Sequence, residues 1–318
     1  MIILVTGCAG FIGFNVAKSL LDKKHTVVGI DSLNNYYPNK IKILRAKILK
    51  KCKNFIFIKS DISDKKKLDK IFKKYKFRDV FHFAAQPGVR RSVKYPKEYY
   101  DANITTFFNI LECSKNYNIN KILFASSSSV YGDNSNFPLK ENSTRKPKNF
   151  YALSKCINED MAKFYSKISK IKFIALRFFT IYGPYGRPDM LIWKMCENSI
   201  QNTKVKINNY GNHERDFTYI DDAIKMIMKI YKKKFKDYEI FNICSNNPVQ
   251  LDKIMKIFDQ YKINKKKKNI YFQKFQSGDV LKTHGSNLKL KKIIKNLKIT
   301  NIKNGIKNTV NWYKNSHF

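Results

Sequence analysis

The first 180 residues alternate short apolar runs with stretches in which apolar residues recur at helical spacing. The expected strands are residues 2–5, 26–30, 55–58, 80–83, 122–125 and 173–176, and the expected helices are residues 11–21, 40–51, 65–75, 97–117 and 152–169. Strands that alternate with helices pair in parallel through right-handed crossovers, which places helices on both faces of the sheet. The pattern therefore predicts an α/β fold built on a doubly wound parallel sheet.

Beyond about residue 181 this alternation weakens. Short strands are expected at residues 205–207, 217–219 and 270–272, and helices at 221–232 and 251–260. We therefore expect a first domain of residues 1–180 and a smaller C-terminal α/β domain made mainly of residues 181–318. A strand at residues 239–243 is expected to return to the first sheet, so the first domain is expected to include a segment from the C-terminal half of the chain.

The formal net charge of +39 would by itself suggest a polyanionic partner. However, the excess is almost wholly lysine, and it is spread along nearly the whole chain. Lysine, asparagine and isoleucine, all abundant here, are what AT-rich codons encode, so a drift in composition explains the charge. We expect no specific nucleic-acid partner.

The six cysteines are scattered singly without a CxxC pair, and no HExxH motif is present. A disulfide framework and a metal site are therefore not expected. The chain has no basic leader, and none of its apolar runs approaches the ~20 residues that a membrane helix needs. These features predict a cytoplasmic protein that does not associate with a membrane.

The segment VTGCAGFIG joins the first expected strand to the first expected helix. Its glycines, Gly7, Gly10 and Gly13, permit a tight turn, a close approach of the backbone to phosphate, and packing of the helix on the strand. Phe11 and Ile12 begin the helix, whose N-terminus is suited to hold a pyrophosphate. The segment predicts a Rossmann-type site for a dinucleotide.

Asp31 ends the second expected strand, where a carboxylate accepts hydrogen bonds from the adenosine ribose hydroxyls and repels a 2′-phosphate. This position favours NAD over NADP as the cofactor. Asp61 and Ile62 follow the third strand, at the expected height of the adenine, although Asp61 could equally cap the next helix. Ala84 and Ala85 follow the fourth strand, where small side chains would let the cofactor pass closely.

Tyr151 and Lys155 are four residues apart in an expected helix and therefore share one face of it. A tyrosine titrates near pH ~10 in water, and a lysine ammonium together with an oxidised nicotinamide would lower that value. Upstream, the segment ASSSSVYG places four serines at the end of an expected strand. Together with the glycine turn, this combination indicates an NAD-dependent enzyme with Tyr151 as its base.

These motifs resemble the extended short-chain dehydrogenase/reductase family, and within it the UDP-glucuronate 4-epimerases. The stretches that carry the resemblance span nearly the whole chain: VTGCAGFIG, DSLNNYY, FHFAAQPGVRRS, ASSSSVYG, YALSK, LRFFTIYGPYGRPDM, RDFTYIDD and SGDV. Sugar-nucleotide 4,6-dehydratases carry acidic residues in the serine region, where this chain has serine and valine, so dehydration is not expected. The resemblance implies reversible C4 epimerisation of UDP-glucuronate to UDP-galacturonate, through a 4-keto sugar and with bound NAD+.

The resemblance also implies roles for the catalytic residues. Tyr151 would remove the proton of the sugar 4-OH, and Lys155 would hold the nicotinamide ribose and tune Tyr151. Ser127 would orient the 4-OH, with Ser128 as a second contact. Aligning on VYG selects Ser127, whereas counting back from Tyr151 would allow Ser126, so this register stays open.

For the substrate, the resemblance points to four arginine or hydroxyl positions and one acid. Arg187, with Thr180 as a hydroxyl donor, would pair the carboxylate of a uronate, because arginine binds carboxylates bidentately. Arg90 could face either that carboxylate or the phosphates, Arg215 would contact the diphosphate, and Asp279 the uridine ribose. Many relatives that use neutral sugars place an arginine just before their Gly-Asp pair; the residues QS stand there in this chain, which shifts phosphate binding onto Arg215.

Two other functions stay open. The nearest alternative is a 4-epimerase of a neutral UDP-hexose or UDP-N-acetylhexosamine, and the remote one is a nucleic-acid-binding protein on a decayed Rossmann core. By resemblance, we also expect a homodimer formed through the helices at residues 97–117 and 152–169.

Overall fold

The computed structural model describes residues 1–261, 269–276 and 280–316. Its centre is a seven-stranded sheet with the order β10-β6-β5-β4-β1-β2-β3, in which all neighbouring strands are parallel. The strands are β1 (Ile2–Thr6), β2 (Thr26–Asp31), β3 (Phe55–Lys59), β4 (Asp79–His82), β5 (Lys121–Ser127), β6 (Lys172–Phe178) and β10 (Tyr238–Ile243). The expected Rossmann-type parallel sheet is confirmed.

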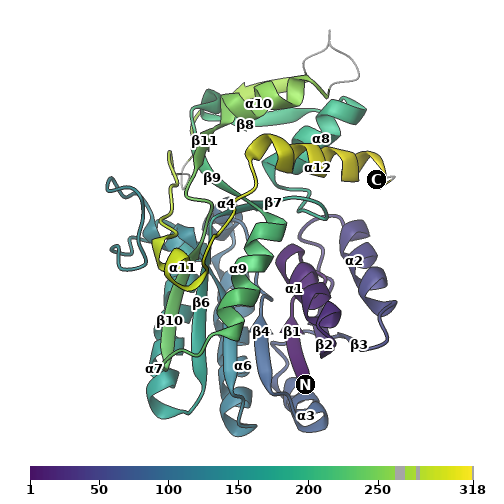
Figure 1. The fold of residues 1–318 in the computed structure, drawn as a ribbon, viewed down its shortest axis with the longest axis vertical. Helices are drawn as coiled ribbons and strands as arrows, with labels where there is room; N and C mark the ends of the chain where they lie inside the picture. Colours follow the sequence, from purple (N-terminus) through teal and green to yellow (C-terminus); the bar gives the residue numbers. More distant parts are fainter. Residues whose placement is uncertain (262–268, 277–279, 317–318) are drawn as a thin grey trace.

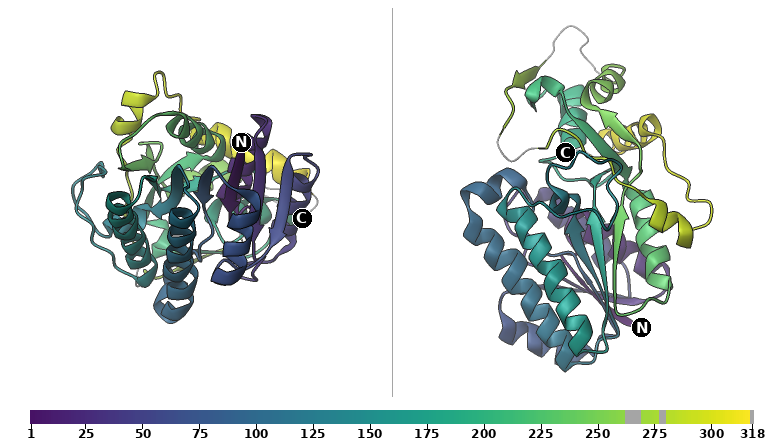
Figure 2. Two further views of the ribbon diagram at one scale, coloured as in Figure 1. Left: turned by 90° about the horizontal axis from the view of Figure 1, so that it is seen from below. Right: turned by 90° about the vertical axis from the view of Figure 1, so that its left-hand side faces the viewer.

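Helices cover both faces of this sheet (Figures 1 and 2). One face carries α1 (Phe11–Asp22) and α9 (Ile220–Lys232), with α2 (Lys40–Lys50) beside α1, and the other carries α3 (Lys65–Tyr75), α6 (Thr106–Asn116) and α7 (Phe150–Ile168). Because both faces are buried, strands such as β1 are almost continuously apolar. Within the described residues, no helix is long and apolar enough to cross a lipid bilayer.

Above the carboxyl ends of these strands lies a smaller set of elements (Figure 1). A three-stranded sheet has the order β11-β9-β7, and a two-stranded sheet pairs β12 with β8. The strands are β7 (Thr180–Tyr182), β8 (Val205–Asn208), β9 (Glu214–Tyr219), β11 (Pro248–Gln250) and β12 (Ile270–Gln273). The helices of the C-terminal half other than α9 are α8 (Leu191–Gln201), α10 (Leu251–Asp259), α11 (Leu288–Ile293) and α12 (Ile302–Lys314), and of these α11 lies against β10.

The expectation of one helix over residues 97–117 is wrong in detail. The segment consists of α5 (Pro96–Tyr99), a π-helical turn (Tyr100–Thr105) and α6, and a short helix, α4 (Val89–Lys94), precedes it. In the π-helical turn, Asn103 is buried, and its side chain accepts from the backbone N–H of Gln86 and donates to Ser154 Oγ. A helix widens in this way where a side chain must meet partners outside it. Here those partners follow β4 and lie on α7.

Arg45 of α2 connects the first turn of the fold to a distant loop. Its side chain has no exposed surface, and its Nη1 donates to the carbonyl oxygen of Ala9 at 2.9 Å. Its Nη2 donates to the carbonyl oxygens of Tyr185 at 2.7 Å and Gly186 at 2.6 Å. Arg45 thus fixes the loop after β7 against the turn between β1 and α1, and the space between the two parts of the fold opens beside this contact.

Candidate active site

The turn between β1 and α1 can be built only with glycine at two of its positions. Gly7 has a φ of +67°, and a Cβ atom there would lie 2.7 Å from the backbone nitrogen of Ala84. A Cβ atom on Gly13 would overlap the carbonyl oxygen of Gly7. The turn therefore packs directly on β4 and α1, and the N-terminus of α1 begins at Gly10 without a side-chain cap. This arrangement leaves the first N–H groups of α1 able to bind an anion.

The two acidic residues expected near the cofactor end adjacent strands. Asp31 accepts from the backbone N–H of Ala9 through Oδ2 at 3.0 Å and from that of Leu33 through Oδ1 at 2.9 Å, which fixes the carboxylate beside the glycine turn. Asp61 does not cap α3, because Asp64 does so by accepting from the N–H of Lys67. The structural alternative for Asp61 is thereby removed, and its contact with the cofactor stays a prediction.

A cleft of about 900 Å³ runs along the carboxyl ends of the strands. Its lining includes every residue expected to bind the cofactor: Gly7, Gly10, Phe11, Ile12, Gly13, Asp31, Asp61, Ile62, Ala84, Ala85, Tyr151 and Lys155. The volume falls within the range of cofactor sites, and the lining provides a helix N-terminus for a diphosphate and a carboxylate for a ribose. The residues present therefore fit a bound NAD. No group of acidic, cysteine and histidine side chains in the described ranges could hold a metal ion.

Tyr151, Lys155 and Ser127 meet at the far end of this cleft. The Ser127 hydroxyl lies close enough to the Tyr151 side chain to lower its pKa, and Lys155 Nζ lies 6.0 Å from the centre of the Tyr151 ring. Ser127 ends β5, whereas Tyr151 and Lys155 lie in the first turns of α7. Asn149 caps this helix by accepting from the N–H of Ala152, and so sets the start of the turn that carries Tyr151.

Burial and local charge oppose each other at these groups. Burial raises the pKa of Tyr151, while the nearby hydroxyl of Ser127 and the positive charge of Arg187 lower it. Burial also lowers the pKa of Lys155 to about 8, although the carboxylate of Glu159 favours its ammonium form. A lysine that titrates near neutral pH is suited to tune a neighbouring base.

The structure separates the two serines that the sequence left open. Ser127 Oγ lies beside Tyr151 and accepts from the backbone N–H of Ser129 at 3.1 Å. Ser126 Oγ instead donates to Glu159 Oε1 at 2.5 Å. Ser128 lines the cleft next to them. The geometry therefore favours Ser127 over Ser126 as the serine that contacts a substrate.

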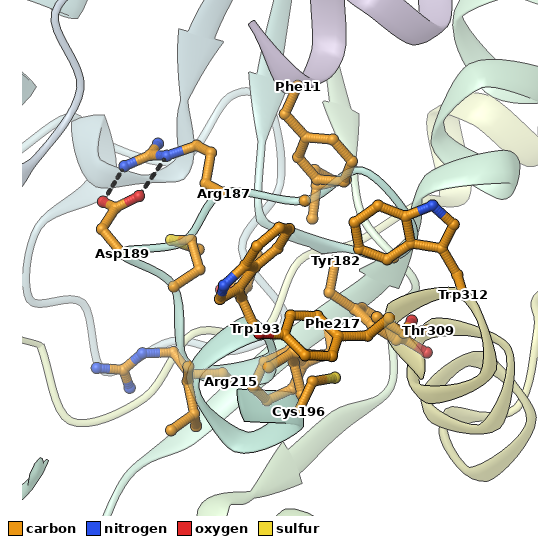
Figure 3. Close-up of a pocket in the computed structure, with 18 of the residues that line it drawn as sticks. Phe11, Tyr182, Arg187, Asp189, Trp193, Cys196, Arg215, Phe217, Thr309 and Trp312 are labelled. Atoms are coloured by element: carbon orange, nitrogen blue, oxygen red, sulfur yellow. Dashed lines mark hydrogen bonds and ion pairs between the residues drawn. The ribbon is translucent and has the colours of Figure 1, made fainter. Parts of the chain in front are cut away.

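A second cavity of about 280 Å³ adjoins the cleft, on the side of α8 and α12. Its lining includes Arg90, Thr180, Arg187 and Arg215, four of the six residues expected to bind substrate, while Ser127 lines the larger cleft. Figure 3 shows Arg187 and Arg215 on one side of this cavity and aromatic side chains, among them Trp193 and Trp312, on the other. The sixth residue, Asp279, lies outside the described residues.

The expected carboxylate ligand, Arg187, lies where the two cavities meet, because it lines both of them. Its Nε and Nη2 donate to the two carboxylate oxygens of Asp189 at 3.0 and 2.5 Å (Figure 3). The carboxylate of Asp189 helps to raise the pKa of Tyr36, whose ring centre lies 5.9 Å from the Arg187 guanidinium. The sequence did not identify Asp189 or Tyr36 as parts of the site, although both lie within motifs that carry the family resemblance.

The other two arginines make contacts with the smaller part of the fold. Arg215 donates to the backbone oxygens of Leu281 at 2.8 Å and Val280 at 2.5 Å. The guanidinium of Arg90 lies against the side-chain amide of Asn208. Both arginines are thus held on the β8 and β9 side of the cavity, opposite the glycine turn.

Comparisons with known proteins agree with this arrangement. The model of the NAD dependent epimerase/dehydratase family matches residues 3–244. The UDP-glucuronate 4-epimerase of Thermodesulfobacterium geofontis is 37% identical over 312 residues, 98% of this chain and 95% of that protein. The chain belongs to the NAD-dependent epimerase/dehydratase family. The expected resemblance to extended short-chain dehydrogenases/reductases, the nucleotide-sugar 4-epimerase group and the cofactor NAD are confirmed.

Solved structures of this family superpose closely on the chain. UDP-glucuronic acid 4-epimerase from Bacillus cereus, in complex with UDP-glucuronic acid and NAD, has a TM-score of 0.92 at 30% identity, with 100% of both chains covered. UDP-glucose 4-epimerase from Thermotoga maritima, with UDP-glucose, has a TM-score of 0.88 at 27% identity, with 99% of both chains covered. Structural likeness therefore extends to enzymes for charged and for neutral sugars.

The glycine turn leads to a first prediction. Replacing Gly7 with alanine puts a Cβ atom against the Ala84 backbone and forces an L-residue into a left-handed conformation, which alone costs about 1–2 kcal/mol. We expect Gly7→Ala to lower the urea midpoint and to weaken NAD binding at least tenfold, measured by calorimetry. Lys18→Ala, at an exposed position on α1, is the control and should change neither quantity. Wild-type NAD affinity in Gly7→Ala would contradict this account of the turn.

Proposed function

We propose that the chain is a UDP-glucuronate 4-epimerase, which interconverts UDP-glucuronate and UDP-galacturonate. The observation that carries the proposal is the position of Arg187, at the junction between the cleft that contains Tyr151 and the cavity that contains Arg215. A sugar placed at Tyr151, with its diphosphate toward Arg215, would have its carboxylate within the surroundings of Arg187 and Thr180. The named relatives that act on UDP-glucuronate support the same substrate.

In this mechanism the side chains of the chain orient the sugar and move one proton. When bound, NAD+ supplies the acceptor and later the donor of a hydride at C4. Tyr151 Oη takes the proton of the 4-OH and returns it at the end of the cycle, while Ser127 Oγ orients this hydroxyl. Lys155 keeps a positive charge close to Tyr151 and favours its phenolate form. Because the sugar must turn over between the two half-reactions, binding energy must come from the nucleotide diphosphate rather than from the sugar ring.

The pKa of Lys155 sets an upper pH limit for this mechanism. With burial lowering that pKa to about 8, the ammonium is lost as the pH rises through this value, and the charge that favours the Tyr151 phenolate disappears. The turnover rate should therefore fall on the alkaline side of about pH 8.

One observation favours the alternative of a neutral UDP-hexose or UDP-N-acetylhexosamine. Asp189 already neutralises Arg187 through two hydrogen bonds, so the pocket is less positive than a lone arginine would make it. UDP-glucose 4-epimerase from Thermotoga maritima also superposes on the whole chain. The two proposals differ in the group that the sugar places at Nη1 of Arg187, which is a carboxylate in a uronate and an uncharged group in a neutral sugar.

The reaction can be tested on the purified protein. We expect UDP-glucuronate, incubated without added nicotinamide nucleotide and then with NAD+, to yield UDP-galacturonate, detected by chromatography. Tyr151→Phe removes the proton acceptor and should lower kcat by roughly 10²–10⁴-fold. Turnover of UDP-glucose or UDP-N-acetylglucosamine without any turnover of UDP-glucuronate would replace this proposal with the alternative.

The role of Arg187 can be tested by comparing two substrates. A charge-assisted hydrogen bond contributes about 1.5–3 kcal/mol, so Arg187→Ala should lower kcat/KM for UDP-glucuronate by roughly 10–150-fold. For UDP-glucose, if it is turned over at all, the change should be small. Arg91→Ala is the matched control, because Arg91 also lines the cleft but pairs with Glu98 at its rim. Equal losses on both substrates would show that Arg187 does not recognise the carboxylate.

We also propose that two copies of the chain form a dimer through α6 and α7. Large apolar side chains are exposed on both helices: Phe108 is 44% exposed, Leu153 41%, Phe164 58% and Ile168 46%. Leu153, Phe164 and Ile168 recur at spacings that place them along one side of α7. Single exposed apolar residues are ordinary, but a run of them along adjacent helices indicates a contact surface.

Phe164→Glu places a charge in the middle of this surface. We expect it to convert a dimer into a monomer, as measured by light scattering after size-exclusion chromatography. Phe272→Glu changes an equally exposed phenylalanine on β12, 50% exposed, and should leave the mass unchanged. A monomeric wild-type protein at micromolar concentration would rule out the dimer.

A further inference from the structure

We infer that Glu159 is a positioning residue, which locks the strand end that carries Ser127 to the helix that carries Tyr151 and Lys155. This inference rests on the proposed roles of those three residues. It concerns a carboxylate that does not line the cleft and that the sequence did not single out.

Glu159 is almost completely buried, with 1% of its surface exposed. Its Oε1 accepts from Ser126 Oγ at 2.5 Å and from Arg177 Nε at 2.8 Å, and its Oε2 accepts from Arg177 Nη2 at 2.7 Å. Arg145 Nη1 lies 3.4 Å from Oε2. The carboxylate thus holds three partners by charge-assisted or short hydrogen bonds, which are the stronger kind.

Glu159 and its two partners in the sheet belong to three separate elements. Ser126 belongs to β5, Arg177 to β6 and Glu159 to α7, and the backbones of Ser126 and Arg177 are register partners in the parallel sheet. Ser126 is directly followed by Ser127, whose hydroxyl contacts Tyr151. The bond from Ser126 to Glu159 fixes the end of β5 against α7, and with it the backbone that carries Ser127.

Glu159 is also aligned with the catalytic residues within α7 itself. Tyr151, Lys155 and Glu159 follow one another at intervals of four residues and therefore lie along one face of α7. One end of this row reaches the cleft at Tyr151, and the other is anchored in the sheet through Arg177. A shift of α7 along β5 that separated Tyr151 from Ser127 would also break the bonds of Glu159.

Glu159 also acts on Lys155 through charge. Its carboxylate favours the Lys155 ammonium and partly offsets the effect of burial. The other ionisable groups around Lys155 cannot replace it: His82 on β4 is neutral, because burial lowers its pKa to about 3, and Tyr151 is the group being tuned. Arg177 and Arg145 carry positive charge and would act in the opposite direction if Glu159 were neutral.

A contribution to the stability of the fold explains the buried Glu159–Arg177 pair less well than a positioning role does. A buried ion pair is often no more stabilising than well-packed apolar side chains, because both charges must lose their hydration. Here Glu159 is bonded to Ser126, the residue before Ser127, and lies one helical turn from Lys155. Its placement serves the geometry and the charge of the proposed catalytic residues.

Glu159→Gln tests the inference, since it keeps the side-chain volume and removes the charge. We expect kcat to fall roughly tenfold or more, KM for the UDP-sugar to stay within about threefold, and the alkaline limb of the kcat profile to move down by roughly one pH unit. Asp160→Asn is the matched control, because Asp160 is the next residue, also pairs with Arg145, and is 61% exposed. It should leave kcat and the pH profile unchanged. A fall in kcat with an unmoved alkaline limb would mean that Glu159 has only a structural role.

Glu159→Gln could fail to fold, because it leaves Arg177 buried without its counter-charge. Ser126→Ala then carries the test, because it removes the tie to β5 and keeps the Glu159–Arg177 pair. We expect a lower kcat with an unchanged KM, an unchanged alkaline limb and a melting temperature close to that of the wild type; wild-type kcat would overturn the positioning role. Absence of epimerase activity in the wild type, or full activity in Tyr151→Phe, would refute the proposed function instead, so the two failures can be distinguished.

Discussion

The active-site cleft depends on a buried guanidinium that has no acidic contact among its described hydrogen-bond partners. Arg45 donates to the carbonyl oxygens of Ala9, Tyr185 and Gly186 and to the hydroxyl of Tyr37. Burial of a charge is unfavourable unless its hydrogen-bonding groups are satisfied, and each carbonyl would in turn lose its donor if the guanidinium left. The glycine turn and the loop that carries Arg187 are therefore mechanically one unit, and neither can move away from the cofactor side of the cleft alone.

A second buried arginine with several hydrogen-bond acceptors, Arg177, lies on the opposite side of the sheet. Arg45 and Arg177 are the largest side chains in the structure that are fully buried. The chain has only eight arginines among 63 basic residues, yet both of these buried cations are arginine. A guanidinium offers five donors in a rigid plane and can hold several acceptors at once, whereas an ammonium is a more strongly hydrated point charge. In a chain whose composition favours lysine, arginine marks positions where this fixed geometry is needed, and Arg187 extends the pattern into the cleft.

The sequence predicted the parallel sheet well because its strands are local apolar runs, most of them followed by a helix with its own periodicity. It missed β7, α8 and α12, whose short or mixed patterns become ordered only by packing on distant elements. The glycine turn, Asp31 and the Tyr151–Lys155 pair were also predicted, since their spacing is local. The choice between Ser126 and Ser127 was not, because it depends on Glu159, which lies 33 residues away. Arg45 carried no local signal beyond being an arginine.

Substrate choice must come from local geometry rather than from the overall charge. A field from a net charge of +39 attracts every nucleotide sugar through its diphosphate, and a uronate more strongly by its one further negative charge, but such attraction raises the encounter rate without recognising where on the sugar that charge lies. The pair of Arg187 and Asp189 is neutral as a unit, which removes simple attraction as a means of selection. Asp189 holds the Nε and Nη2 edge of the guanidinium, so the Nη1 side is the part left to meet a sugar. On this geometry, Asp189 determines the orientation of Arg187, and under the proposed function a carboxylate would be selected by how well it matches the fixed N–H directions.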